Sequence, residues 1–189
     1  MKYKFLKTVV AAFALAVSGF ANAAWIEINF ADLTQNTQYA NYAGVEFDLI
    51  GGLDSSGDPF VTTGGIHNSN NSWYPTAQIL QFSFSTLVEE ISFILDNYGS
   101  GNGSFWTAFG TDNSVLETGS FSSGGGAFSL SATNVAYIQF NNNQPSSNWN
   151  FQVSSFSARE IANVPEPSTL AILALGVMGL ASRKFKKQA

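Results

Sequence analysis

The sequence contains no cysteine, and basic residues are nearly absent outside its two ends. Without cysteine there are no disulfides, thiol nucleophiles, thiolate zinc sites or iron–sulfur ligands. Only Arg159 lies between residues 24 and 163, where twelve acidic residues give a formal charge of about −11. Because nucleic-acid binding needs many Lys and Arg contacts to phosphates, this balance excludes nucleic acid as a partner. A region of about 140 residues is long enough to be held together by its apolar core alone.

Residues 1–23 have the pattern of a secretory signal peptide. Three lysines provide its positive charge: Lys2, Lys4 and Lys7. Residues 8–20 are apolar, and Ala21 and Ala23 place small side chains at the two positions that a signal peptidase recognises. We therefore expect export, cleavage by signal peptidase and a mature chain that starts at Ala24. The alternative is an uncleaved membrane anchor.

Apolar and polar residues alternate with a period of two through much of residues 24–163. The clearest segments are 45–49, 80–85, 91–95, 105–109, 135–140 and 151–153. Such alternation places one side of a strand in a core and the other side in water. Breaks rich in Gly, Asn, Ser and Pro separate the segments, and amphipathic helices of useful length are missing. The pattern predicts an all-β fold for 24–163: an antiparallel β-sandwich of jelly-roll type with nine or ten strands.

The composition changes after Asn163. Pro165 and Pro167 flank Glu166, and because neither proline can donate a ladder hydrogen bond, the sandwich is expected to end here. Residues 168–182 are almost wholly apolar and predict a helix of about 22 Å, short of the ~30 Å hydrocarbon thickness. A basic end, 183–187, is expected to stay on the cytoplasmic side of the membrane. Its charged residues are Arg183, Lys184, Lys186 and Lys187.

The Pro-Glu-Pro motif, the apolar helix and the basic cluster, in this order over residues 164–189, resemble the PEP-CTERM sorting signal. The resemblance implies recognition by an exosortase, an integral-membrane cysteine-dependent transpeptidase of Gram-negative bacteria that make exopolysaccharide. This enzyme would remove the helix and release the protein to the cell exterior or attach it there. The implied route is export through the inner membrane, transient anchoring, and delivery to the cell surface or extracellular matrix. A plain C-terminal anchor that is never processed is the alternative.

Catalytic residues are not evident in the sequence. His67 is the only histidine, lies in a polar segment and is expected to be a solvated loop residue; multi-histidine metal sites need more than one. A Gly-x-Ser-x-Gly elbow does not accompany it. A glycosidase pair needs only two spaced carboxylates, and the candidates are Glu46, Asp48, Glu89, Glu90 and Asp96. Their strand and turn positions favour ordinary solvated carboxylates, so we expect no enzyme.

Asp54 and Asp58 frame a Ser-Ser-Gly turn and offer the hard oxygen ligands that calcium prefers. The spacing is not that of an EF-hand, and Asp and Ser in turns more often bond to the backbone. Calcium at Asp54 and Asp58 is thus a candidate, and no other cofactor is expected.

Residues 24–163 contain 22 aromatic side chains, more than a core of this size readily needs. Sugars stack their C–H faces on rings while nearby amide and carboxylate groups bond to their hydroxyls. Trp73, Tyr74 and Trp149 lie beside Asn-rich segments and are the preferred candidates for glycan contacts. Trp106 ranks below them, and core packing is the alternative for each.

These observations favour an exported, non-enzymatic surface or matrix-associated protein that binds exopolysaccharide weakly. Two alternatives stay open. One is a purely structural surface component without a ligand, and the other is a secreted glycoside hydrolase.

Overall fold

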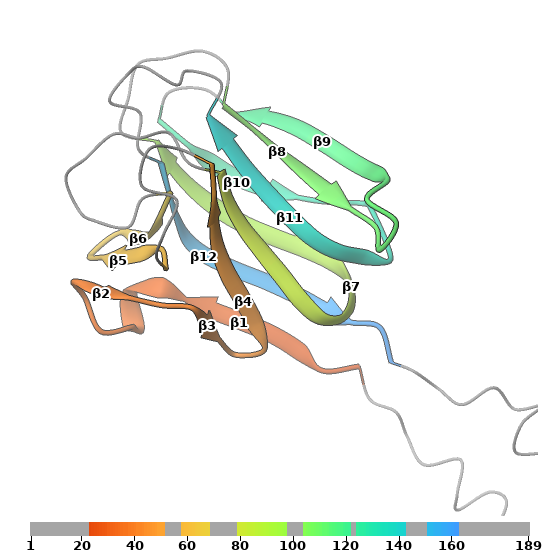
Figure 1. Ribbon diagram of the computed structural model, residues 1–189, viewed down its shortest axis with the longest axis horizontal. Coiled ribbons are helices and arrows are strands. Elements are labelled where there is room, and N and C mark those ends of the chain that lie inside the picture. Colours follow the sequence, from red (N-terminus) through yellow and green to blue (C-terminus); the bar gives the residue numbers. More distant parts are fainter. Residues whose placement is uncertain are drawn as a thin grey trace, which may run out of the picture. The chain divides into compact units, whose positions relative to one another are not determined.

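A computed structural model describes residues 23–51, 58–68, 79–97, 104–121, 124–142 and 151–162 (Figure 1). All strand pairs among these residues are antiparallel, which confirms the prediction of an antiparallel all-β fold. The compact unit that they form spans Ala23–Ile161. Within the described ranges, no helix has the length and apolar character needed to cross a membrane. The predicted signal segment up to residue 22 and the tail from residue 163 lie outside them.

The longest strand, β7 (Ile79–Asn97), belongs to two layers. Its first half pairs with β4 (Val45–Ile50) and β11 (Val135–Asn142), and its second half pairs with β10 (Gly126–Ser129) and β12 (Phe151–Glu160). Figure 1 shows β7 bending sharply, so that its second half runs back behind the first. The sequence predicts two separate strands here, because a chain that changes layers usually does so through a loop.

The bend in β7 occurs without glycine or proline. Glu90 takes a positive φ of 52°, which turns the chain within an otherwise extended segment. Arg159 of β12 forms a salt bridge to Glu89 at 2.7 Å and a second one to Glu90. The one basic residue of the predicted domain is therefore occupied at this bend. Since these side chains are partly exposed, the ion pairs orient the bend more than they stabilise the fold.

The other strands complete the two layers. The first layer continues with β3 (Asn41–Tyr42) beside β4, and with β8 (Ser104–Phe109) and β9 (Val115–Phe121) beyond β11. In the second layer β12 pairs with both β1 (Trp25–Asn29) and β6 (Gly65–His67), followed by β5 (Phe60–Thr62) and β2 (Thr37–Gln38). A short 3-10 helix, η1 (Phe30–Asp32), follows β1. The described residues form twelve strands, more than the predicted nine or ten, because two-residue strands show no alternation.

Phenylalanine side chains fill the space between the layers. Phe82 is fully buried, and its ring centroid lies within 6 Å of four others: Phe30, Phe47, Phe140 and Phe156. The alternation predicts the buried side of β4 correctly. In β8 it predicts the wrong side, because it places Phe105 and Phe109 in the core. Trp106 and Ala108 are buried there, whereas Phe105 and Phe109 are half-exposed. Gly119 explains the difference, because a Cβ at this position would lie 2.4 Å from the Trp106 ring.

Candidate functional site

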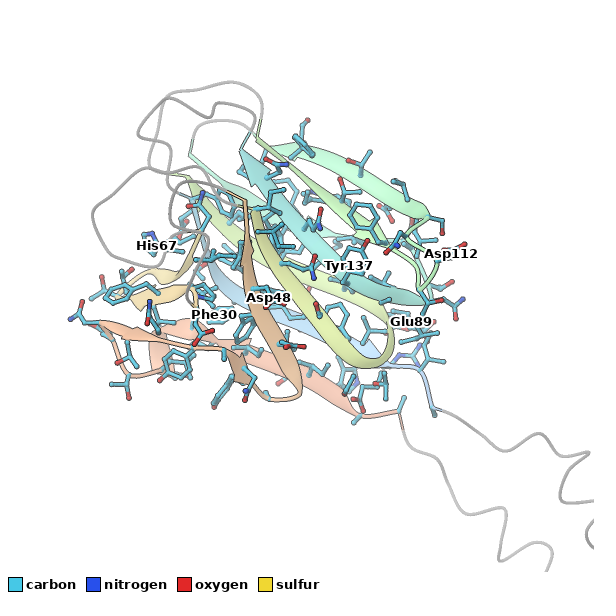
Figure 2. The ribbon with its side chains drawn as sticks, in the orientation of Figure 1. Phe30, Asp48, His67, Glu89, Asp112 and Tyr137 are labelled. Atoms are coloured by element: carbon cyan, nitrogen blue, oxygen red, sulfur yellow. The ribbon has the colours of Figure 1, made fainter. Side chains whose placement is uncertain are left out.

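Two rows of side chains cross the outer face of the first layer, and each row takes one residue from β4, β7, β11, β8 and β9 in turn. The first row is Asp48, Gln81, Gln139, Thr107 and Thr118; the second is Glu46, Ser83, Tyr137, Phe109 and Val115. Directly paired residues project from the same face of a sheet. At the usual strand spacing of about 4.8 Å, each row is about 19 Å long. We call these ten residues the glutamine face; Figure 2 shows Asp48 and Tyr137 on the nearer layer.

The two glutamines at the centre of this face are linked by hydrogen bonds. Gln139 Nε2 donates to Gln81 Oε1 at 2.8 Å, and Gln81 Nε2 donates to Ser83 Oγ at 2.9 Å. Both amides are half-buried, and a glutamine side chain can make up to four hydrogen bonds. The chain of bonds therefore fixes the amides and still leaves bonding capacity toward solvent. A ligand bound here costs less side-chain entropy than one bound by free side chains.

Two threonines extend the polar row toward β9. Thr118 Oγ1 donates to the backbone oxygen of Trp106 at 2.8 Å and lies 3.3 Å from Thr107 Oγ1. Because the Thr118 proton is used in the first bond, Thr107 is the donor in the second. The row thus has two amides followed by two hydroxyls, linked by hydrogen bonds within each pair.

An aromatic pair stands beside the amides. The rings of Phe109 and Tyr137 are stacked, with centroids 4.6 Å apart and planes inclined by 13°. The Tyr137 hydroxyl donates to Asn113 Oδ1 at 2.9 Å, in the turn between β8 and β9. Asp112 holds that turn by accepting bonds from the backbone N–H and hydroxyl of Ser114, and these bonds lower the pKa of the Asp112 carboxyl. The turn therefore positions the tyrosine ring.

A hollow of about 380 Å³ is lined by residues of β3, β4 and β7 and the turn between β3 and β4. Its polar lining comes from Asn41, Glu46, Ser83 and Ser85. Ser83 is also the cross-strand partner of Tyr137, so one residue of the lining lies next to the aromatic pair. Since serine is small, β7 leaves room beside the tyrosine ring.

Two carboxyl groups, Glu46 and Asp48, occupy the β4 side of the glutamine face. Burial raises the pKa of the Asp48 carboxyl, and the negative charges of Glu46 and Asp58 raise it further. None of the ten residues is basic, and Arg159 is engaged with Glu89 and Glu90 at the β7 bend. The face therefore carries only negative charge.

A second hollow, of about 620 Å³, lies on the outer face of the second layer. Its polar groups include Glu27, Asn29, Asp32 and several serines, of which Ser92 and Ser157 bond to each other at 2.8 Å. The three phenylalanines in its lining belong to the core or pack against it: Phe93, Phe128 and Phe156. It thus has no linked pair of amides beside a ring, as the glutamine face has.

The prediction that His67 is a solvated loop residue is wrong. His67 ends β6, is only 6% exposed and lies 2.9 Å from Thr62 Oγ1 through Nε2. Thr62 Oγ1 donates to Gln152 Oε1 at 3.2 Å, so it accepts from the histidine. Burial lowers the pKa of His67, with an opposing contribution from a hydrogen bond to Gln152. A three-residue strand is too short to show alternation, which is why the sequence suggested a loop.

The structure also corrects the weakest glycan candidate, Trp106. This side chain is 4% exposed and packs against Phe93, with ring centroids 5.8 Å apart. Among the residues described, no group of three or more metal-ligating side chains is present. Asp58 and Ala23 are described and half-buried. The other predicted site residues lie outside the described residues: Ala21, Asp54, Trp73, Tyr74, Trp149, Pro165, Glu166, Pro167, Arg183, Lys184, Lys186 and Lys187.

The strand ends next to four undescribed segments lie at the same end of the two layers (Figure 1). Ile50 pairs with Ile79, Asn97 with Phe151, and Ser104 with both Phe121 and Asn142. Leu80 of β7 pairs with Phe140 of β11, so the Ile50–Ile79 pair lies near the Ser104–Asn142 pair.

Comparison with solved structures found similarity to carbohydrate-binding domains at low identity. The CBM36-1 domain of a multidomain xylanase from the hindgut metagenome of Trinervitermes trinervoides is 10% identical, over 71% of this chain and 96% of that chain (TM-score 0.37). The module CBM6cm-2 from Cellvibrio mixtus lichenase 5A, in complex with cellotriose, is 13% identical over 74% and 98% (TM-score 0.31). Both scores are below 0.5, so no residue or ligand is carried over to this chain.

No curated protein sequence matches the chain. Residues 163–187, however, match the PEP-CTERM protein-sorting motif, which confirms the resemblance seen in the Pro-Glu-Pro segment, the apolar stretch and the basic end. The chain therefore carries a PEP-CTERM protein-sorting motif.

Proposed function

We propose that this is an exported, non-enzymatic protein of the cell surface or extracellular matrix that binds exopolysaccharide weakly through the glutamine face. One observation carries the binding proposal: a fixed Gln139–Gln81–Ser83 hydrogen-bond chain lies next to the Phe109–Tyr137 ring pair. Sugar hydroxyls bond to amide and hydroxyl groups, and the C–H faces of sugars pack on aromatic rings. The ten residues lie on the outer surface of one layer, so a ligand bound there buries little of its surface and the affinity is low.

The remaining predictions extend this proposal. Signal peptidase removes residues 1–23, an exosortase acts at Pro165–Pro167, and the segment 168–182 is a transient membrane helix. The sandwich is of jelly-roll type. Trp73, Tyr74 and Trp149 provide further glycan contacts, and Asp54 and Asp58 bind calcium. The strand ends beside the loop candidates lie together at one end of the layers, which supports a shared site for these residues alone.

Replacing Tyr137 by leucine is expected to weaken retention on native exopolysaccharide at least about fivefold, because the ring beside the amides is lost. Tyr137→Phe keeps the ring and loses only the bond to Asn113, so its retention stays within about twofold. Affinity electrophoresis of the full chain, with calcium and then with EDTA, measures this.

The control is Ser129→Ala, an exposed residue of β10 on the second layer. It should bind like the wild type, and thermal melting confirms that each variant is folded. Wild-type retention in Tyr137→Leu would place the binding site elsewhere, and no retention of the wild type would favour a purely structural role.

A glycoside hydrolase is the second candidate, since Asp48 has a raised pKa and a carboxyl neighbour, Glu46, on the same strand. Such a pair is the minimum that the hydrolytic mechanism requires. Release of reducing sugar that is abolished by Asp48→Asn would replace the binding proposal with this one.

Processing of the tail makes a separate prediction. Mass spectrometry of the mature surface protein should find no peptide from residues 183–187 in wild-type cells. Cells that lack the sorting enzyme should retain those peptides. Their recovery from the mature protein of wild-type cells would contradict removal of the tail and leave an unprocessed anchor.

A further inference from the structure

We infer that the glutamine face selects uncharged polysaccharide and rejects chains that bear carboxylate, phosphate or sulfate groups. The inference rests on the proposed function of this face and names the class of polysaccharide that it takes. It is carried by the arrangement of charge across the two rows. Their central residues are amides, hydroxyls and rings, whereas Glu46 and Asp48 form the β4 side.

A bound chain that crosses the amide row has to pass close to these carboxyl groups. Asp48 is the direct cross-strand partner of Gln81, and Glu46 is the partner of Ser83. Paired residues have Cβ atoms about 4.5–5.5 Å apart, so a sugar bonded to Gln81 or Ser83 lies within one strand spacing of a carboxyl. An anionic substituent on that sugar meets a like charge at short range.

A compensating cation is missing from the face. The ten residues include no Lys or Arg, and the single Arg of residues 24–163 binds Glu89 and Glu90 at the bend. Anionic sugars are usually held by a guanidinium or ammonium group, because charge-assisted bonds offset the desolvation of the anion. The donors that the centre of the face offers to a ligand are neutral: the Gln81 and Gln139 amides and the Ser83 hydroxyl.

The groups that remain suit a neutral sugar. Amides and hydroxyls both donate and accept, which matches hydroxyl groups that do the same. The polar lining of the hollow beside β4 is Asn41, Ser83 and Ser85 in addition to Glu46. A single carboxylate also accepts from a sugar hydroxyl, so it disfavours only the charged substituent.

The test compares two forms of one polymer. One form is the neutral fraction of the native exopolysaccharide, and the other is the same fraction after partial carboxymethylation. Affinity electrophoresis measures the retention of the full chain on each form. At about 0.1 M salt, where charges are screened beyond ~10 Å, carboxymethylation should weaken retention at least tenfold. At about 1 M salt the screening length is ~3 Å, and the difference should shrink to less than about threefold.

A pair of charge variants locates the effect. The double variant Glu46→Gln, Asp48→Asn should reduce the difference at 0.1 M salt to about threefold or less, because retention on the carboxymethylated polymer rises relative to the neutral one. The matched control is Glu27→Gln, Asp32→Asn, which removes two charges from the hollow of the second layer. It should leave the tenfold difference unchanged.

Each outcome is decisive. Equal retention on the two polymers at 0.1 M salt overturns the selectivity and leaves the proposed binding intact. If Glu27→Gln, Asp32→Asn reduces the difference in retention equally, the rejection comes from the total charge of the protein. That result overturns the role of the face. A tenfold difference that persists in the Glu46→Gln, Asp48→Asn variant also overturns the role of the face. Absence of retention on both polymers overturns the proposed function together with this inference.

Discussion

Replacing Phe82 by alanine is expected to lower the free energy of unfolding by about 3–5 kcal/mol. Phe82 lies in the first half of β7, is fully buried and has four other phenylalanine rings around it. Those rings come from η1, β4, β11 and β12, so the vacated space borders both layers. Because the surrounding strands are fixed by their pairing, the cavity cannot collapse fully, and its cost adds to the lost transfer free energy.

Urea denaturation followed by tryptophan fluorescence measures this change. A typical domain has only 5–15 kcal/mol of stability, so the loss should shift the midpoint strongly. Val115→Ala is the control, because this β9 residue is 61% exposed and should change stability by less than about 0.5 kcal/mol. A Phe82→Ala effect below about 1 kcal/mol would mean that this cluster is not the centre of the core.

The alternation in the sequence was enough to predict the buried side of a strand when the size of its cross-strand partners did not reverse it. In β4 the apolar residues Val45, Phe47 and Leu49 are buried as predicted. It failed in β8, where Trp106 points inward because its cross-strand partner is Gly119. The size of a partner on another strand is not visible from the local sequence, and both phases of β8 contain apolar residues.

The candidate site was missed for a related reason. Gln81 and Gln139 each appear as ordinary outward residues of their own strands, 58 positions apart in the sequence. Only the register of β7 with β11 makes them neighbours. A usable signal was present, since these outward positions are amides and hydroxyls rather than the charged residues typical of a solvated face. The buried polar cluster of His67, Thr62 and Gln152 likewise depends on pairing of β6 with β12.

The same β6–β12 pairing imposes a strict requirement on one glycine. Gly65→Ala is expected to lower the free energy of unfolding by about 2–6 kcal/mol, the sum of about 1–3 for backbone strain and 1–3 for overpacking. Gly65 has a φ of +148°, which L side chains rarely adopt. An added Cβ would lie 2.2 Å from the backbone oxygen of Val153, so β6 and β12 would have to separate.

Gly44→Ala separates the two causes. Gly44 also has a positive φ, +81°, but nothing lies within 4 Å of an added Cβ. Replacing it by alanine should lower the free energy of unfolding only by the contribution of backbone strain, about 1–2 kcal/mol. Urea denaturation of both variants, with amide hydrogen exchange at Ile66, should show the larger loss and the greater exchange in Gly65→Ala. Equal losses would show that the close approach of β6 to β12 does not limit residue 65, and the order of the two variants therefore tests the pairing that buries His67.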